Sequence, residues 1–555
     1  MSGERASEFR GVVRRGRGWL PVLGVTALLG SGVALALPTV LGRSVDAIVA
    51  HHGYGKWFAL AAGLIAIGIG CALVEVFTGT ACVVSTTAWL RHRLVSNVVR
   101  SGPDGTRAFD TGDLVTRVSG NAVDAAQAGP AIVNAVAAIV PPAGSLVLLA
   151  LIDPWLAAAF FGGILLVIGV LWVFARRTAE ISLAYQETQG RIAGLLTEAL
   201  TGLRTITAAG TNAREERRIL ALLPELHKHG LLTWRVLARS GAQAAIVGPL
   251  VLVAVLAVGG LQLVAGRITA GELFAAGQYA VLGAGLGSLT GVLGELARAR
   301  AGSRRAGEVL AVETVAHGTL PLPAGPGRLT FDGVSVVAGE KVLLAGVNLE
   351  LPGGATVAVV GPSGAGKSVL AALAARLRDP SEGQVLLDGV PLQAVNRQML
   401  RAAIGCAFER PQLVGTTVGD AISHHVIGPV RTLAAARATH AHDFVSRLPD
   451  GYRTPLLKAP MSGGERQRLG LARAWPASRL LVLDDATSSL DTATEMQISK
   501  TLTEDRHRRT RLIVTHRTAT AARADLVIWL DSGLVRAVGS HAELWQDACY
   551  REVFG

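Results

Sequence analysis

The sequence predicts a multidomain membrane protein, with an all-α part that crosses the membrane six times followed by an α/β part. Two observations lead to this fold class. Half of the 555 residues are hydrophobic and only 17% are charged, which is rare in a soluble protein of this length. Six long apolar segments lie in the first 300 residues, and short β-rich runs that alternate with helical patterns follow them.

Each of the six apolar segments is long enough to span the hydrocarbon core, which takes about 20 residues in a helix. The stretches after the second and fourth segments are long and rich in arginine, and excess positive charge marks the cytoplasmic side. We therefore expect a protein of the cytoplasmic membrane with both termini, both long loops and the α/β part in the cytosol. The predicted spans are 19–41, 57–80, 131–152, 155–174, 242–264 and 273–293.

The two long loops are predicted to be helical, because the leucines and alanines of residues 195–206 recur at helical spacing. The spans should therefore continue as helices well into the cytosol. After the sixth span a helix is expected to run to about Val312, and a Pro- and Gly-rich stretch then indicates a linker. The predicted boundaries are 1–312 for the membrane domain, 313–328 for the linker and 329–555 for the α/β domain.

The net charge of +12 indicates the lipid bilayer as a partner and not a nucleic acid. The basic residues cluster beside apolar spans, where the anionic inner leaflet attracts them, and aromatic residues for base stacking make up only 5% of the chain. The four cysteines have no metal-like spacing, so neither a structural disulfide nor a zinc site is expected. The arginine-rich start lacks a small-residue cleavage site, so we predict no cleavable signal.

The strongest chemical signal is a P-loop between a buried strand, 357–360, and a helix. Its glycines let backbone N–H groups wrap phosphate oxygens, and the helix N-terminus adds the positive end of its dipole. Lys367 is expected to reach the β and γ phosphates and Ser368 to bind Mg²⁺. ATP and Mg²⁺ are the predicted cofactors. The loop consists of Gly361, Pro362, Ser363, Gly364, Ala365, Gly366, Lys367 and Ser368.

Three downstream features belong with this loop. An apolar strand, 480–483, ends at Asp484, and a carboxylate at that end of a strand lies beside the phosphate site as a Mg²⁺ ligand. Ser462 can cap a helix that begins with two glycines, which makes a second anion-binding N-terminus. His516 ends a further apolar strand.

In this order the motifs resemble those of the ATP-binding-cassette (ABC) exporters, as a half-transporter whose resemblance covers nearly the whole chain. The resemblance implies an ATP hydrolase coupled to transport. It also implies a dimer with a second half-transporter, in which each ATP lies between the P-loop of one subunit and the signature of the other. Short coupling helices are expected near 121–124 and 184–195. The matching motifs are Walker A (361–368), the signature Met461, Ser462, Gly463, Gly464 and Glu465, Walker B (480–484), the D-loop ending at Asp491, and the switch histidine His516.

Several positions depart from the family pattern. Asp485 stands where the family has the glutamate that polarises the attacking water, and its shorter carboxylate lies farther from that water. In the Q-loop, Glu409 replaces the usual glutamine, although a carboxylate there can still bind the metal. The aromatic residue that stacks on adenine is replaced in the stretch 336–338 by Val, Val and Ala. We therefore predict the degenerate-site half of a heterodimer; a homodimer that tolerates Asp485 is the alternative.

The membrane part says little about the transported compound. An apolar cavity with few charges suits export of an amphipathic or lipophilic substrate, such as a peptide, a lipid or a drug-like compound. Two alternatives stay open: an importer of a metal-chelating compound with an exporter-like fold, and a regulatory membrane ATPase that transports nothing. The predicted catalytic residues are Asp485, His516 and Glu409, with Ser368, Asp484 and Glu409 as candidate metal ligands.

Overall fold

The computed structural model describes residues 11, 14–284, 287–424, 427–503 and 509–554, and the chain divides into two compact units. The helical unit contains the residues up to Asn97 together with Phe109–Val312. The α/β unit contains Val98–Ala108 and Glu313–Gly555, so it includes a short segment that the sequence assigns to the membrane part.

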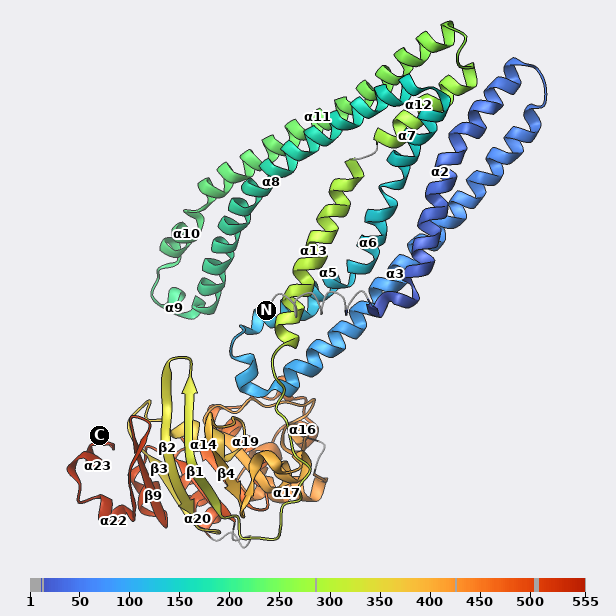
Figure 1. Ribbon diagram of the computed structural model, residues 1–555. Coiled ribbons are helices and arrows are strands. Elements are labelled where there is room, and N and C mark those ends of the chain that lie inside the picture. Colours follow the sequence, from blue (N-terminus) through green and yellow to red (C-terminus); the bar gives the residue numbers. More distant parts are fainter. Residues whose placement is uncertain (1–10, 12–13, 285–286, 425–426, 504–508, 555) are drawn as a thin grey trace. The chain divides into compact units, whose positions relative to one another are not determined.

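The helical unit consists of helices joined by short turns (Figure 1). Among the described residues, three helical stretches are long and apolar enough to cross a membrane, and two shorter apolar stretches accompany them in α8 and α11. The helices are η1 (Gly16–Gly18), α2 (Leu20–Val49), α3 (Tyr54–Thr106), α4 (Thr111–Thr116), the π-turn η2 (Arg117–Asn121), α5 (Ala122–Ala126), α6 (Ala128–Ala137), α7 (Val140–Ile152), α8 (Pro154–Thr201), α9 (Leu203–Ala208), α10 (Asn212–Leu220), α11 (Leu223–Val264), α12 (Ala270–Ala284) and α13 (Gly287–Leu310).

The predicted spans coincide with these helices. The first three lie in the long apolar stretches Leu20–Val49, Tyr54–Thr106 and Thr111–Ile152. The apolar parts of the fourth and fifth lie in Pro154–Leu166 and Gly248–Val264. The sixth begins in α12 and reaches α13 across residues 285–286, which lie outside the described part of the chain.

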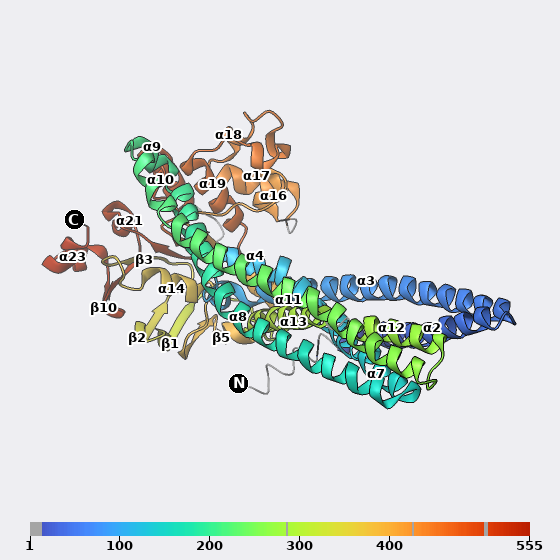
Figure 2. The same cartoon turned by 90° about the horizontal axis from the view of Figure 1, so that it is seen from above.

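The longest helices extend far beyond their apolar parts, as the periodicity predicts. Helix α8 has 48 residues and α11 has 42. At about 1.5 Å per residue, α8 is roughly 70 Å long, more than twice the thickness of a hydrocarbon core. The two helices lie side by side in both views (Figures 1 and 2).

The expected positions of the coupling helices are wrong. Residues 184–195 lie inside the continuous helix α8. Asn121 accepts a 3.4 Å hydrogen bond from Arg305 of α13, so residues 121–124 pack within the helical unit. The chain reverses instead after a kink at Gly102, whose φ of 71° is outside the helical region, and around the short helix α9. The family resemblance implied that coupling helices exist but did not fix the points where this chain turns back.

One end of the helical unit is held together by a polar contact between α2 and α12. Gly42 and Gly271 approach so closely that a Cβ on Gly271 would lie 2.0 Å from the Gly42 carbonyl oxygen. The Asp46 carboxylate accepts hydrogen bonds from the Gly271 N–H at 2.7 Å and from the Thr269 hydroxyl at 2.8 Å. Asp46 therefore caps the start of α12 and fixes it to α2.

The α/β unit contains two sheets and a set of helices. One sheet has four strands in the order β2-β1-β4-β5, all antiparallel, and the other has six in the order β10-β9-β3-β8-β7-β6. The strands are β1 (Leu329–Ala338), β2 (Lys341–Leu351), β3 (Thr356–Val360), β4 (Glu382–Leu387), β5 (Val390–Pro391), β6 (Ile404–Phe408), β7 (Leu480–Asp484), β8 (Thr510–Val514), β9 (Leu526–Asp531) and β10 (Leu534–Gly539).

The α-helices of this unit cover the sheets and carry the remaining motifs. A buried core of aliphatic side chains from both sheets and from the helix after β3 joins them into one body. The helices are α14 (Lys367–Ala374), α15 (Arg397–Ala403), α16 (Val418–Ser423), α17 (Pro429–Ala438), α18 (His442–Val445), α19 (Gly463–Ala474), α20 (Thr492–Thr503), α21 (Thr518–Ala522), α22 (His541–Leu544) and α23 (Ala548–Glu552).

The six-stranded sheet brings the sequence motifs to one edge. Its strands β3, β8, β7 and β6 are neighbours and run parallel. Their carboxyl ends therefore meet at the same edge, where ligands bind in open α/β sheets. The P-loop follows β3, His516 lies two residues after β8, Asp485 follows β7 and Glu409 follows β6.

Candidate nucleotide-binding site

The P-loop depends on glycine for its backbone path. Gly361 has a φ of 152°, and a Cβ there would lie 2.1 Å from the Leu530 carbonyl oxygen. Gly366 has a φ of 99° and is the N-cap of α14, and a Cβ there would lie 2.8 Å from a methyl carbon of Leu344. Because the N-cap offers no side-chain acceptor, the first N–H groups of α14 are available to an anion.

Lys367 is held inside this loop. Its side chain is 7% exposed, and its ammonium donates hydrogen bonds to the carbonyl oxygens of Gly361 at 2.7 Å and Pro362 at 2.9 Å. Burial lowers the pKa of Lys367, while the negative charges of Asp485 and Asp484 oppose that shift. A cation is therefore fixed where the phosphate groups of a nucleotide are expected.

Ser368 and Asp484 come together as predicted ligands of one metal ion. The Ser368 hydroxyl donates a 3.0 Å hydrogen bond to the Asp484 carboxylate at the end of β7. Burial raises the pKa of Asp484, the bond from Ser368 lowers it, and the charges of Asp485 and Glu409 raise it further. A hydroxyl and a carboxylate this close, in surroundings that favour an added positive charge, fit the oxygen ligands of Mg²⁺.

Asp485 lies directly beside this pair in an unusual backbone conformation. Its φ of 49° is in the left-handed region, which aspartate tolerates better than most residues. Its carboxylate is 3.7 Å from the Nε2 atom of His516. Burial raises the pKa of Asp485, whereas His516 and Lys367 lower it. The structure thus pairs the residue after Walker B with the predicted switch histidine.

Glu409 completes this set from β6. Its side chain is 54% exposed, and its carboxylate lies 3.7 Å from the guanidinium of Arg410. The three predicted catalytic residues share one groove of about 250 Å³, which we call the Walker groove. The Walker groove is lined by Glu409, Asp485, Thr487, Ser488, Thr515, His516 and Arg517.

The signature residues line a different groove, which we call the signature groove. Ser462 caps α19 by accepting a 3.2 Å hydrogen bond from the Glu465 N–H, and Glu465 accepts a 2.8 Å bond from the Ser462 N–H in return. Asp491 caps α20 by accepting from the Thr494 N–H at 2.9 Å, which lowers the pKa of Asp491. The signature groove, of about 370 Å³, is lined by Ser462, Gly463, Gly464, Glu465, Arg468, Ser489, Leu490 and Asp491.

Gln467 connects the two grooves, and the sequence did not single it out. Its side chain is 2% exposed. The amide nitrogen donates to the carbonyl oxygen of Glu409 at 2.7 Å and to the Ser488 hydroxyl at 2.9 Å, and the amide oxygen accepts from the Ser489 N–H at 2.9 Å. The sequence did contain a sign that Gln467 is buried. It stands three, four and seven residues before Gly470, Leu471 and Ala474, which are buried on one face of α19.

The stretch expected to meet adenine offers only aliphatic side chains. Val336 is buried in the core, whereas Val337 is exposed at the end of β1. Neither provides an aromatic face for stacking.

Comparison with known proteins agrees with this geometry. The family model described as the ABC transporter transmembrane region matches residues 20–283, and the one described as ABC transporter matches residues 344–488. A solved structure of a bacterial Atm1-family ABC exporter with ATP bound aligns with a TM-score of 0.80 at 25% identity, covering 97% of this chain and 98% of that one.

Curated relatives extend the match over nearly the whole sequence. The ABC transporter ATP-binding protein RamA of Streptomyces coelicolor is 46% identical, over 94% of this chain and 83% of its own length. A multidrug efflux ATP-binding/permease protein of Mycobacterium tuberculosis is 30% identical over 95% of this chain but only 45% of its own length. An ATP-dependent lipid A-core flippase of Syntrophus aciditrophicus is 29% identical over 88% of this chain and 83% of its own length.

A P-loop, a Walker B carboxylate and a capped signature helix on one α/β unit define an ATPase of the ATP-binding-cassette class. The chain belongs to the ABC transporter family, in which ATP hydrolysis drives transport, and it has the fold of an exporter with its membrane domain fused to its ATPase domain.

Proposed function

We propose that this chain is one half of a dimeric exporter that moves an amphipathic or lipophilic compound outward across the cytoplasmic membrane. The observation that carries the proposal is the match of 97% of the chain to a solved bacterial ABC exporter. Several relatives are named for multidrug efflux, fatty acids or lipid A-core, and these names point to lipophilic or amphipathic compounds. In this proposal residues 1–312 carry the substrate pathway, 313–328 link the domains and 329–555 hydrolyse ATP in the cytosol.

The placement of the site residues supports the following roles. The P-loop residues Gly361 to Ser368 wrap the triphosphate, and the buried ammonium of Lys367 neutralises its charge. Ser368 and Asp484, with Glu409 in the same set, would hold a Mg²⁺ ion, which would supply positive charge to the triphosphate. Asp485 orients the attacking water, and His516 lies beside it as a second polar contact.

The separation of the two grooves supports a dimer. The Walker groove holds the predicted catalytic residues, whereas Ser462, Gly463, Gly464, Glu465 and Asp491 line the signature groove. A nucleotide that needs both sets is therefore completed by a second half-transporter. The N-terminus of α19 at Ser462 presents the positive end of its dipole to the triphosphate in the partner's Walker groove.

We further propose that the partner is a different half-transporter and that this chain contributes the slow site. Asp485 is one methylene shorter than glutamate, so its carboxylate reaches less far toward a water that the longer residue would contact. Glu409 adds negative charge beside the expected phosphate groups, and the stretch 336–338 offers no aromatic ring to stack on adenine. The signature groove retains its serine, glycines and cap, so it can still complete a competent site on the partner.

Transport by the co-expressed complex in inside-out membrane vesicles tests the export proposal. With MgATP added outside, we expect accumulation in the lumen of at least one of three probes: a lipophilic cationic dye, a short-chain fluorescent phospholipid and an amphipathic peptide. Lys367→Ala should abolish accumulation, because truncating one partner of a buried charged pair costs about 2–5 kcal/mol, which weakens ATP binding by about 30-fold to several thousandfold. Fluorescence of the vesicles with and without ATP is the measurement.

Other outcomes would contradict the proposal in distinct ways. ATP-dependent release from inside-out vesicles would indicate import. Turnover of ATP without movement of any probe, unchanged by their addition, would favour a regulatory ATPase. A wild-type complex that fails to retain ATP would overturn the assignment of the site itself.

A further inference from the structure

The nucleotide site has a direction, because the residues around it lie on different sides of the P-loop strand. On one side of β3 lie β8, β7 and β6, which lead to His516, Asp485 and Glu409. On the other side lie β9 and β10. A triphosphate whose terminal phosphate lies beside the Walker groove therefore directs its nucleoside toward the side of β9 and β10.

Two segments border the P-loop on that side. The Gly533 N–H, in the turn between β9 and β10, donates to the Ala365 carbonyl oxygen at 3.2 Å, and the Ala345 N–H of β2 donates to the Gly533 carbonyl oxygen at 3.0 Å. A Cβ on Gly366 would lie 2.8 Å from a methyl carbon of Leu344 in β2. We call this turn and the β1–β2 hairpin the nucleoside floor, because they continue the surface of the P-loop.

The strand register identifies the hairpin residue that extends this floor. Val336 lies opposite Leu344, and Ala338 lies opposite Lys341. Because successive side chains of a strand point to opposite faces, Ala338 shares the face of Val336, whereas Val337 points to the other face. Ala338 is two residues, or about 7 Å, beyond Val336 along β1. It is exposed at the end of that strand.

The nucleoside floor offers no aromatic ring. Ala338 presents only a methyl group, and the segments 338–343 and 531–535 contain no aromatic residue. The nearby Trp529 of β9 is 2% exposed. Stacking on an aromatic side chain is worth about 5- to 150-fold in affinity, and its strength differs between bases. The floor therefore lacks the contact that would favour a purine over a pyrimidine.

The polar side chains beside this floor do not read a base edge either. One oxygen of the Asp531 carboxylate accepts from the Ser532 hydroxyl at 3.0 Å, and the other lies 3.4 Å from the Arg536 guanidinium. Glu340 and Lys341 are exposed at the tip of the hairpin. Holding such long side chains in one geometry costs rotamer freedom, so they present no fixed donor or acceptor.

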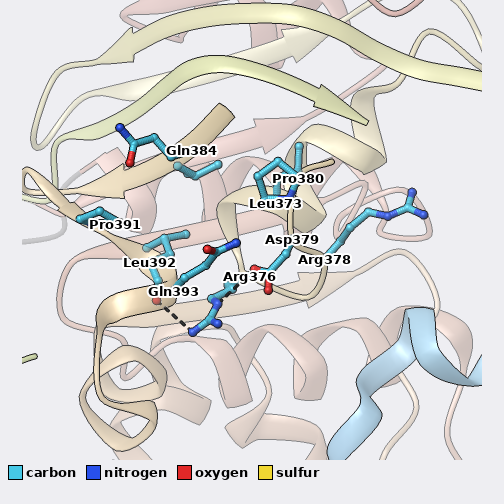
Figure 3. Close-up of a pocket in the computed structure, with 10 residues that line it drawn as sticks. Leu373, Arg376, Arg378, Asp379, Pro380, Gln384, Pro391, Leu392 and Gln393 are labelled. Atoms are coloured by element: carbon cyan, nitrogen blue, oxygen red, sulfur yellow. Dashed lines mark hydrogen bonds and ion pairs between the residues drawn. The ribbon is translucent and has the colours of Figure 1, made fainter. Parts of the chain in front are cut away.

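The other end of α14 provides no alternative place for a base. A small pocket beyond its C-cap is lined by Arg376, Asp379 and Leu392 among others, with the Arg376 guanidinium directed at the other two (Figure 3). Its volume is about 50 Å³, whereas a cavity that takes up benzene has about 150 Å³. A base ring therefore does not fit there.

We propose that the P-loop site of this chain selects the triphosphate and not the base, and that Ala338 is the position that sets this tolerance. Purine and pyrimidine nucleoside triphosphates then bind with similar affinity, because the buried ammonium of Lys367 and the N–H groups of α14 contact phosphate alone. The inference rests on the proposed function of this site in binding nucleotide. In the rival explanation, the partner subunit or another segment recognises adenine.

Photolabelling of the whole complex, resolved by subunit, measures this tolerance. The probe is radiolabelled ATP that carries a benzophenone on its ribose, so its base and triphosphate are unchanged. The complex binds the probe with Mg²⁺ on ice and is crosslinked by light, and the subunits are then separated by gel electrophoresis. Displacement of the label from this chain by ATP, GTP, CTP, UTP or inorganic tripolyphosphate gives an apparent affinity for each competitor.

In the wild-type complex the four nucleotides should displace the label with affinities within about threefold of one another, because no stacking contact separates them. Tripolyphosphate should compete within about tenfold of ATP, because the phosphate contacts dominate. Ala338→Tyr should increase the affinity for ATP and GTP by at least about fivefold and that for CTP and UTP less. Its affinity for tripolyphosphate should stay unchanged. Lys367→Ala should abolish labelling of this chain.

Val337→Tyr is the matched control. It adds the same ring at the adjacent exposed residue, whose side chain points to the other face of β1. Displacement by all five competitors should therefore stay as in wild type. Because both positions are exposed at the end of the strand, neither ring needs space in the core.

Three results would overturn the inference. A preference of the wild-type site for ATP over CTP and UTP of about tenfold or more would show that the base is recognised. An unchanged ratio of purine to pyrimidine affinity in Ala338→Tyr would show that the base does not lie over this residue. An equal gain in Val337→Tyr would remove the assignment to one face of the strand. Failure of every triphosphate to displace the label from the wild-type chain would instead contradict the proposed function.

Discussion

The Walker groove and the signature groove lie on the same α/β unit but differ in how closely each keeps the chemistry of its family. In the Walker groove, Asp485 and Glu409 replace the usual glutamate and glutamine. Outside this groove, residues 336–338 of β1 are aliphatic where an aromatic ring is expected. In the signature groove, Ser462 and Glu465 form a complete capping box. This difference supports the proposal that the chain holds the slow ATP site and offers an intact signature groove to a partner.

The electrostatics of the two grooves differ in the same sense. Burial raises the pKa of Asp484 and of Asp485, so the Walker groove favours protonation or an added cation. In the signature groove, N–H donors lower the pKa of Asp491, so that carboxylate is stabilised in its ionised form. The two grooves therefore differ in sign, because the surroundings disfavour the ionised carboxylates at Asp484 and Asp485 and favour the ionised carboxylate of Asp491.

The largest expected effect comes from damaging the signature groove. Gly463→Asp places a carboxylate where the partner's triphosphate would lie, and the nearest atom to the new Cβ is 3.8 Å away, so the fold accommodates it. Like charges at a closed interface cost several kcal/mol, so we expect ATP turnover of the purified complex to fall by about a hundredfold. Phosphate release at saturating MgATP measures it.

Gly463→Ala is the control for this change, because it adds the Cβ without the charge. It should retain at least half of the turnover. If Gly463→Asp left turnover unchanged, the signature groove would not face a nucleotide, and the comparison between the grooves would lose its functional meaning.

A much smaller effect is expected from the Walker groove. If this chain holds the slow site, Asp485→Ala should reduce turnover of the complex by about twofold or less. A general base is worth roughly 10²–10⁴ in rate, so a homodimer that relies on Asp485 would lose nearly all activity. The same phosphate-release measurement separates these two results.

Asp485→Glu tests the same proposal by restoring the usual carboxylate length, which should increase turnover. The longer carboxylate brings the base closer to the water, so turnover should rise if the missing methylene limits this site. Loss of nearly all turnover in Asp485→Ala would contradict the degenerate-site proposal and favour the homodimer.

Most of the fold could be predicted from the sequence, because long apolar segments and a P-loop between a strand and a helix have few alternative structures. The extension of α8 and α11 beyond their apolar parts followed from helical spacing. The points where the chain reverses could not be predicted, because the kink at Gly102 and the turn at α9 depend on local backbone geometry that hydrophobic periodicity does not contain. The assignment of Val98–Ala108 to the α/β unit depends on tertiary contacts such as Arg378 with Asp104.

The candidate site shows the same division. The spacing of the motifs predicted that the P-loop, Asp484 and His516 lie close together, because the carboxyl ends of parallel strands share an edge. The contact of Asp485 with His516 and the left-handed backbone of Asp485 required coordinates. Gln467 was not predicted, because a single glutamine among charged residues does not form a recognisable sequence motif. Its three hydrogen bonds nevertheless join both grooves.

The smallest expected effect is a difference of sign between the two grooves in the pH dependence of stability. Burial raises the pKa of Asp485 above its unfolded value, so its contribution is fully present below the unfolded pKa and is lost as pH rises through the folded pKa. The pKa of Asp491 is lowered, so its contribution is present above the unfolded pKa and is lost as pH falls through the folded one.

Replacing each carboxylate by its amide removes the corresponding dependence. From about pH 4 toward neutral, the Tm of Asp485→Asn should rise relative to wild type, because the variant no longer ionises a buried group. As the pH increases from acid values, wild type gains stability when Asp491 ionises. The Tm of Asp491→Asn should therefore fall relative to wild type, because the variant lacks the ionised cap of α20. Thermal melts of the nucleotide-free protein in matched buffers measure both differences. Equal slopes for the two variants would show that the grooves do not differ electrostatically, and the contrast between them would then rest on side-chain length alone.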